Sequence, residues 1–209
     1  IKIFATLNSA FIAPSLYQLY DPYSGNNDLL PEESISREIG IEMINQKRNL
    51  SIVFFEREEN PKIIYEYDFS TFTGGYINSS SDLTFRGVEI DYSKKFFNKM
   101  DFNFNYTFNE LKSGTLQRLP KHSFNESITY YLKNNKQLSF IYRYRGKREA
   151  LGVTEILDSY GLMDLRYSFS IDKMEFNFWI NNIFNKEHVE ILNYSSKGRN
   201  IRFGISYEF

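Results

Sequence analysis

Strict alternation of apolar and polar residues limits what this chain can form more than any other feature. From Met100 to Asn109, Met, Phe, Phe, Tyr and Phe alternate with Asp, Asn, Asn, Thr and Asn. Successive side chains of a β-strand point to opposite faces, so a strand here has one apolar and one polar face. The end of the chain repeats the pattern, with Arg, Gly, Ser and Glu between large apolar residues (Ile201, Phe203, Ile205, Tyr207 and Phe209).

Similar alternation predicts strands through most of the chain, and their connections alternate in length. Short connections fall at 45–48, 97–99, 133–136 and 171–173, and long ones near 12–33, 58–81, 110–121, 146–158 and 185–198. Transmembrane β-barrels join their strands by short periplasmic turns and long extracellular loops. The pattern predicts about ten antiparallel transmembrane strands, with three residues facing lipid (Phe102, Phe104, Tyr106) and two facing a wet lumen (Asn103, Asn105).

Composition fits this prediction and excludes several other classes. Phe, Trp and Tyr make up 18% of the 209 residues, as expected for aromatic girdles, although the mean hydropathy of −0.46 is that of a soluble protein. Apolar runs are short, such as the four residues 52–55, whereas a spanning helix needs about 20. The net charge of −1 gives no support for nucleic-acid binding, and the lack of cysteine removes disulfides and thiolate metal sites.

A soluble β-sandwich or lectin-like barrel is the structural alternative, because its strands also alternate and its turns recur at similar spacing. Strict alternation of long and short connections favours the membrane barrel, since Greek-key folds mix hairpins with crossovers. Alternation already begins at Ile1, without an initiator Met or signal peptide. We therefore expect the chain to be the C-terminal portion of a longer protein.

Three segments carry motifs of a known family. Residues 8–42 contain Ala-Pro-Ser-Leu (13–16), Gly-Asn (25–26), Leu-Pro-Glu (30–32) and Glu-Ile-Gly (38–40). Residues 85–92 contain Gly-Val-Glu, and residues 181–209 contain an Asn-Ile-Phe-Asn-Lys box, a Gly-Arg turn and a terminal aromatic residue. In order and spacing these segments resemble TonB-dependent outer-membrane transporters. Two positions depart from the family pattern: Ile183 replaces the common Leu, and His188 stands where an aromatic residue is usual.

The resemblance implies a 22-stranded barrel with a plug in its lumen. Residues 1–209 would then supply about ten C-terminal strands, and the rest of the receptor would supply the plug and the N-terminal strands. Implied partners are the TonB–ExbB–ExbD complex, acting through the plug, outer-membrane lipid and lipopolysaccharide, and a surface lipoprotein. The implied function is active transport of a scarce large ligand across the outer membrane, without an enzymatic step or cofactor.

Within this family the chain is most similar to the cobalamin branch. Residues 13–26 (APSLYQLYDPYSGN) and 116–121 (LQRLPK) carry that similarity. Ferric-siderophore and haem receptors share much of the pattern and remain the first alternative. A stand-alone porin and an adhesin or assembly barrel are more distant alternatives.

Candidate ligand-binding residues lie in the long loops. Tyrosines there combine an apolar ring with a hydroxyl group and could form a platform for a large ligand. The alternative is that they form the extracellular aromatic girdle and pack the loops against each other. Arg118 could donate to amide or phosphate oxygens of a corrin ligand, although a contact with lipopolysaccharide phosphate is an equal alternative. The predicted set is Arg118, Tyr17, Tyr20, Tyr23, Tyr67 and Asn26.

Other polar residues are assigned structural roles. His122 and Ser123 are neighbours on a strand and would point to opposite faces, which argues against a hydrolase site. His188 is expected to be an exposed loop residue rather than a metal or ligand contact. Inward charges are expected to form the polar wall that meets the plug (Arg143, Arg145, Arg166, Arg202, Glu42, Glu89, Asp91 and Glu175).

Overall fold

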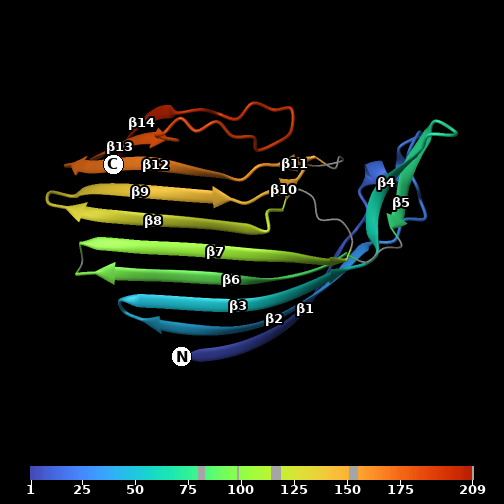
Figure 1. Ribbon diagram of the computed structural model, residues 1–209, viewed down its shortest axis with the longest axis horizontal. Coiled ribbons are helices and arrows are strands. Elements are labelled where there is room, and N and C mark those ends of the chain that lie inside the picture. The colour runs from blue at the N-terminus through green and yellow to red at the C-terminus, as the bar shows by residue number, and fades with distance from the viewer. Residues whose placement is uncertain (80–82, 98, 114–118, 151–154, 209) are drawn as a thin grey trace.

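A single antiparallel sheet of ten strands makes up most of the chain. The structure, a computed structural model, describes residues 1–79, 83–97, 99–113, 119–150 and 155–208. Each strand of the sheet pairs with the next one, and β1 and β14 form the edges (Figure 1). The strands are β1 (Lys2–Ile12), β2 (Glu32–Asn45), β3 (Arg48–Glu59), β6 (Leu83–Phe96), β7 (Met100–Ser113), β8 (His122–Leu132), β9 (Lys136–Arg145), β12 (Tyr160–Ile171), β13 (Met174–Asn181) and β14 (Asn200–Tyr207). The predicted number of strands is confirmed.

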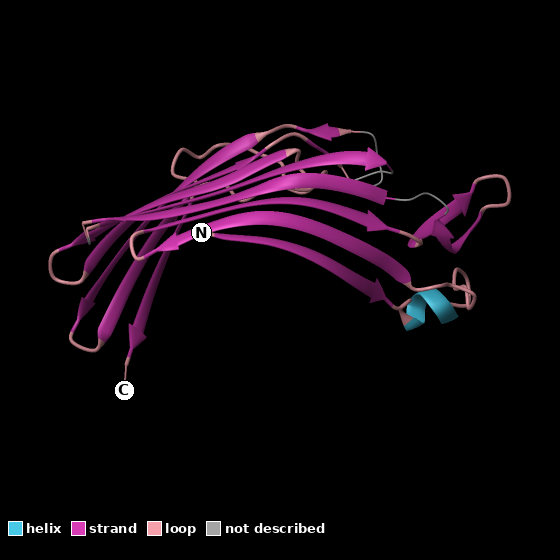
Figure 2. Cartoon of the chain, turned by 90° about the horizontal axis from the view of Figure 1, so that it is seen from below, coloured by secondary structure: helices cyan, strands magenta, loops and turns pink. Residues whose placement is uncertain are grey.

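Short turns gather at one end of this sheet and long connections at the other. Figure 2 shows the sheet strongly twisted and curved, with a helix and a hairpin beyond its long-loop end. These additional elements are α1 (Leu16–Tyr20), β4 (Lys62–Asp68), β5 (Thr73–Ser79), β10 (Arg148–Glu149) and β11 (Ile156–Leu157). In the described part of the chain, no helix is long and apolar enough to cross a bilayer.

Strand register makes one face of the sheet polar from strand to strand. Asp91 pairs with Asn105, and Asn105 pairs with Asn125. Asn125 in turn pairs with Arg143 on β9. Because paired residues of an antiparallel sheet share a face, the polar side chains form a continuous wall. All the predicted wall residues lie on this face (Arg143, Arg145, Arg166, Arg202, Glu42, Glu89, Asp91 and Glu175).

The opposite face is apolar and largely exposed. Phe104 on this face contacts the ring of Phe124, whereas Asn103 donates to Ser127 on the polar face, as the predicted register requires. Exposed large side chains on the apolar face include Ile3 (74%), Leu7 (72%), Phe54 (55%) and Phe203 (55%). Only six apolar residues among those described are buried (Leu29, Leu83, Ala150, Leu157, Tyr160 and Leu162).

A soluble sandwich would bury one face of the sheet against a second layer. Here one sheet of ten strands exposes its apolar face, and the other described sheets are hairpins of two strands. An exposed apolar face of this size suits lipid rather than water. The architecture therefore agrees with the predicted part of a transmembrane barrel and not with the soluble alternative.

Aromatic rings cover two glycines of the sequence motifs. A Cβ atom at Gly40 would lie within 2.5 Å of the Phe4 ring on the neighbouring strand. A Cβ atom at Gly87 would overlap the carbonyl oxygen of Phe108 and lie 2.5 Å from the Phe55 ring. Glycine is needed at both positions because the neighbouring chain approaches so closely. These motif residues therefore shape the wall of the barrel.

Candidate ligand-binding surface

Helix α1 stabilises the loop that carries most of the predicted tyrosines. Ser15 and Gln18 form a capping box. The Ser15 hydroxyl accepts from the backbone N–H of Gln18 (3.2 Å), and the Gln18 side-chain oxygen accepts from the backbone N–H of Ser15 (2.8 Å). After the helix, the Asp21 carboxylate accepts from the hydroxyl and the backbone amide of Ser24. The hydrogen bond from the Ser24 hydroxyl is the main reason that the pKa of Asp21 is lowered. The loop is thus held by its own side chains.

This loop docks on the hairpin formed by β4 and β5. The Asn26 side chain donates to the carbonyl of Tyr76 (3.0 Å), and the Tyr76 amide donates to the carbonyl of Ser24 (3.0 Å). Further along, the side chain of Asn78 exchanges two hydrogen bonds with the backbone of Leu30 (2.8 and 2.9 Å). The Ile63 amide also donates to the Glu32 carboxylate (2.8 Å). Five hydrogen bonds therefore join the first two long loops into one unit, which we call the tyrosine platform (12–33 with 62–79).

Tyrosine rings reinforce the joint between the two loops. Tyr76 lies edge-on to Tyr65 (5.3 Å between ring centroids) and to Tyr17 (6.1 Å). Tyr20 and Tyr23 are 65% and 92% exposed. These two rings are available to a ligand without loss of the packing that holds the platform.

The predicted binding residues thus occupy different environments. Tyr67 packs edge-on against Phe69 on the hairpin (4.9 Å between centroids). The side-chain amide of Asn26 already donates to Tyr76 in joining the loops, so Asn26 shapes the surface that a ligand would meet. Arg118 lies outside the described residues, as do all of residues 114–118 in the long connection predicted at 110–121. The structure brings Tyr17, Tyr20, Tyr23 and Asn26 onto one platform, and their contacts with ligand stay a prediction.

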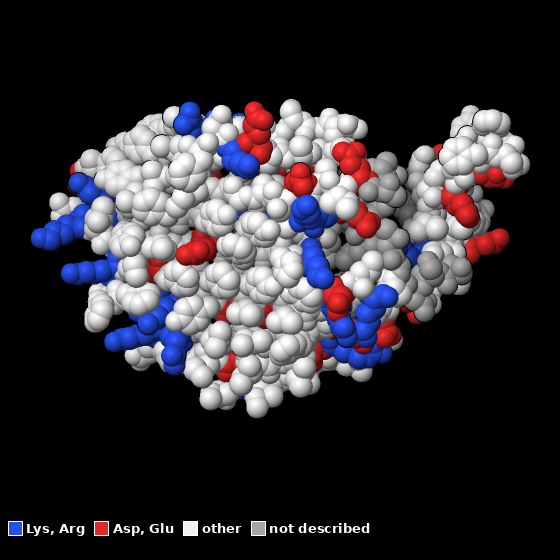
Figure 3. Space-filling view, viewed as in Figure 1, with Lys and Arg blue, Asp and Glu red and all other residues white. Residues whose placement is uncertain are grey.

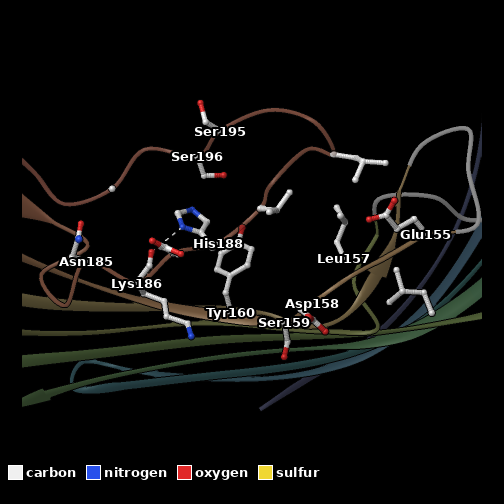
Figure 4. Close-up of a pocket in the computed structure, with 15 residues that line it drawn as sticks. Glu155, Leu157, Asp158, Ser159, Tyr160, Asn185, Lys186, His188, Ser195 and Ser196 are labelled. Carbon is white, nitrogen blue, oxygen red and sulfur yellow. Dashed lines mark hydrogen bonds between the residues drawn. The ribbon is translucent and has the colours of Figure 1, made fainter.

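A second concave surface, which sequence reasoning missed, lies between the last two long connections. A cavity of about 760 Å³ is bounded by segments 155–160, 185–189 and 192–198. Figure 4 shows His188 and Tyr160 facing each other in its wall, beneath the segment that carries Ser195 and Ser196. The lining mixes acidic, hydroxyl and aliphatic groups, so it can accept hydrogen bonds from a polar ligand.

A cluster of four side chains lies beside this cavity, and two of them, Tyr160 and His188, line it. Arg148 donates to the carbonyls of Val189 and Glu190 (2.8 and 3.0 Å) and lies 5.4 Å from the ring of Tyr160. The rings of Tyr160 and His188 are 4.6 Å apart, and the Glu190 carboxylate is 3.4 Å from the Tyr160 hydroxyl. The expected exposure of His188 is wrong, because its side chain is only 4% exposed. The later part of the same loop, with Ser195 and Ser196, covers the ring (Figure 4). The polar residues next to His188 in the sequence give no sign of this burial.

The Asn-Ile-Phe-Asn-Lys box fixes the start of this last loop. Asn182 is 4% exposed and exchanges two hydrogen bonds with the backbone of Lys186 (2.8 and 2.9 Å). Its backbone N–H donates to the Asp164 carboxylate (2.8 Å), and this carboxylate also forms an ion pair with Arg143 (2.6 Å). The Asn185 side chain accepts from the amide of Arg199 (2.9 Å), which closes the Gly-Arg turn. The motif residues therefore position the loop.

The geometry of His122 and Ser123 agrees with the sequence interpretation. His122 Nδ1 lies 2.8 Å from the hydroxyl of Tyr106, and its ring is 5.2 Å from that of Phe108. Ser123 lies on the polar face, where it pairs with Arg145. The two side chains cannot act together as nucleophile and base, because a strand holds them on opposite faces.

Comparisons with known proteins agree with the barrel and its motifs. The family model described as TonB dependent receptor-like, beta-barrel matches residues 1–183. The chain is 28% identical over 222 residues to the vitamin B12 transporter BtuB of Vibrio cholerae serotype O1, covering 98% of this chain and 34% of the relative. BtuB of Photobacterium profundum is also 28% identical, over 218 residues, covering 100% of this chain and 36% of the relative. The chain thus spans about a third of these relatives' length.

Solved structures share the fold at lower sequence identity. The copper transporter OprC superposes with a TM-score of 0.83 at 16% identity, covering 99% of this chain and 37% of that chain. The siderophore receptor PirA of Acinetobacter baumannii gives a TM-score of 0.81 at 16% identity, covering 99% and 39%. The ten strands correspond to part of each of these outer-membrane barrels. Since the family model matches most of its residues, the chain belongs to the TonB-dependent receptor-like β-barrel family.

Proposed function

We propose that the complete protein is a TonB-dependent outer-membrane transporter of cobalamin. The observation that carries this proposal is the similarity to vitamin B12 transporters, which extends over 98% of the chain. Residues 1–209 would provide ten strands of the barrel and several ligand-binding loops. The plug and the remaining strands would come from the rest of the receptor.

The chemistry of the tyrosine platform supports a ligand of this kind. Cobalamin is a wide macrocycle with a rim of amide groups, so it needs a broad apolar surface and many hydrogen-bond partners. Tyr20 and Tyr23 present exposed rings with hydroxyl groups, on a platform whose shape five hydrogen bonds maintain. A preformed platform reduces the entropy lost when the ligand binds.

Loop charge favours cobalamin over the first alternative, an anionic ferric siderophore. The range 12–33 contains four acidic residues and no Lys or Arg (Asp21, Asp28, Glu32 and Glu33). The range 58–81 contains four acidic residues and one lysine (Glu58, Glu59, Glu66, Asp68 and Lys62). Like charges at a binding surface slow association and oppose binding of an anion. A haem or siderophore receptor would need cationic groups from other loops, such as Lys112, Arg118 and Lys121 in the range 110–121.

Transport in this proposal requires no covalent chemistry. Ligand would bind to the loops from outside, and the TonB–ExbB–ExbD complex would act on the plug to open a path along the polar wall. The wall carries opposed charges, such as Arg143 with Asp164 and Lys2 with Glu42, that a plug could contact when it is in place. This part of the proposal rests on the family.

Titration of the complete receptor with cobalamin tests the proposal. Arg118→Ala should weaken binding by about 1–3 kcal/mol, the range for loss of a hydrogen bond to a charged group. A double change of Tyr20 and Tyr23 to Ser should weaken binding and leave the barrel folded, because both rings are exposed. Arg48→Ala at the opposite end is the matched control and should bind cobalamin normally.

Wild-type receptor that binds a ferric siderophore tightly and cobalamin undetectably would overturn the ligand assignment. The family assignment would remain, since it rests on the family model and not on the ligand. Normal cobalamin binding by the double tyrosine variant would instead remove the platform from the binding site.

A further inference from the structure

The two ends of the barrel wall differ in charge. Cationic side chains project from the end with the short turns, as Figure 3 shows in blue. We call this set the basic rim: Lys47, Arg48, Lys94, Lys95, Lys99, Lys133, Lys136 and Lys173. All eight lie in the short turns or within three residues of them, and all are exposed except Lys94, which is partly buried.

Cations of the basic rim make no close ion pairs among the described residues. None of the eight forms an ion pair there. Cations of the strands near the long loops are paired instead: Arg37 lies 2.7 Å from Glu58, and Arg86 lies 2.7 Å from Glu110. Fewer acidic side chains lie at this end, among them Asp101 opposite Lys95 and Asp172 beside Lys173, so the basic rim keeps an excess of positive charge.

Backbone contacts hold the turns of the rim side by side. The amide of Lys95 donates to the carbonyl of Lys47 (2.8 Å), which joins the first two short turns. The amide of Tyr131 donates to the carbonyl of Lys99 (2.8 Å), which joins the second turn to the third hairpin. The cations thus form an arc along the sheet end rather than isolated charges.

Part of this arc faces outward, directly beyond the apolar face. Arg48, Lys94 and Lys136 share the outward face with the apolar residues two positions further along their strands. Arg48 and Lys94 are also direct cross-strand partners. Like charges in that position repel each other, and an anion between them would relieve the repulsion.

Aromatic residues accompany the outward cations. The Lys94 ammonium lies 4.4 Å from the centroid of the Phe96 ring, and Phe97 in the same turn is 91% exposed. Lysine with phenylalanine at the edge of an apolar surface is typical of the region where lipid head groups meet acyl chains. Short turns lie on the periplasmic side of such barrels.

We propose that the basic rim binds anionic phospholipid head groups, phosphatidylglycerol in particular, in the periplasmic leaflet of the outer membrane. Arg48 and Lys94 would share one phosphate, and Lys136 would hold another along the same edge. This lipid ring would neutralise the rim and fix the depth of the barrel in the bilayer.

The test is lipid selectivity of the complete receptor. Receptor in detergent is equilibrated with equal amounts of phosphatidylglycerol and phosphatidylethanolamine, and retained lipids are counted by native mass spectrometry. Wild type should retain phosphatidylglycerol preferentially. The variant R48Q/K94Q/K136Q should lose that preference about tenfold, since each cation near an anionic lipid surface strengthens attraction several-fold. About 1 M salt, where the Debye length is about 3 Å, should weaken the wild-type preference too.

A matched control removes three lysines near the long loops (K62Q/K147Q/K197Q) and should keep the wild-type preference. Heat-modifiable gel migration verifies that each variant is folded, and the single change Lys136→Glu serves if the triple variant is not. Equal retention of the two lipids by wild type, or an unchanged preference in the rim variants, would overturn the proposal. Rim-dependent binding to purified peptidoglycan with unchanged lipid selectivity would also overturn it, in favour of a cell-wall contact.

Discussion

Gly87→Ala should destabilise the barrel much more than Gly161→Ala, although both glycines lie inside strands under a neighbouring aromatic ring. At Gly87 the added methyl group would overlap the Phe108 carbonyl oxygen, which belongs to the backbone of the next strand. At Gly161 it would overlap only the hydroxyl end of Tyr142, and this side chain can rotate away. Overlap with a fixed backbone atom must be relieved by moving a strand.

The expected sizes follow from this difference. Overpacking that requires a backbone shift costs about 1–3 kcal/mol, so Gly87→Ala should lower the free energy of unfolding by about 1–2 kcal/mol once the unfolded-state gain common to both changes is subtracted. Replacing Gly by Ala also restricts the unfolded chain and stabilises by about 0.4–1 kcal/mol. At Gly161 this gain offsets the cost of moving Tyr142, and the net change should stay within about 1 kcal/mol.

Double variants separate the two causes. In a Tyr142→Leu background, Gly161→Ala should be neutral or stabilising, because the overlapping atoms are gone. In a Phe55→Leu background, Gly87→Ala should still destabilise, since the Phe108 carbonyl remains. The measurement is the urea midpoint of the complete receptor in phospholipid vesicles, read by heat-modifiable gel migration. Wild-type stability of Gly87→Ala, or full rescue by Phe55→Leu, would refute the backbone-overlap argument.

Three further predictions concern register, loop anchoring and closure. Phe104→Lys should cost about 2–4 kcal/mol near the bilayer midplane, whereas Asn103→Lys on the polar face should cost much less, and equal costs in urea unfolding would contradict the register. Asp164→Asn should lower the free energy of unfolding by about 1.5–3 kcal/mol, because the carboxylate pairs with Arg143 and accepts from the backbone amide of Asn182. It should also speed amide hydrogen exchange in the loop after Asn182, and unchanged exchange would contradict this anchoring role. Expressed alone, residues 1–209 should show no heat-modifiable migration, because two strand edges lack partners, and an ion-conducting monomer would contradict this.

Sequence periodicity determined the strands and their faces. Alternation is a property of consecutive residues, so Met100–Asn109 specifies an apolar and a polar face before any partner strand is known. The short turns and the positions of Phe104 and Asn103 were predicted on this basis and are confirmed. Lipid-facing barrels keep this signal clear, since each face meets only one kind of environment.

Local signals were less complete within the long loops. Ser15 and Gln18 have the spacing of a capping box, and that spacing could have predicted α1. The hairpin of β4 and β5 has no comparable turn signal. Phe72 at its tip adopts a positive φ of 56°, where Gly or Asn would be expected. The sequence therefore indicated a long loop where the structure has a hairpin.

Only the tertiary structure decided how distant segments meet. Asn26 and Tyr76, 50 residues apart, join two loops into the tyrosine platform, and Asp164 links the barrel wall to Asn182. His188 is buried because a later part of its own loop and Tyr160 from a neighbouring strand cover it. The physical reason is that periodicity reports the environment of each residue along the chain. Contacts between loops depend on how the whole sheet pairs and curves. This arrangement brings together residues that are far apart in the chain, and the sequence around one of them does not indicate the other.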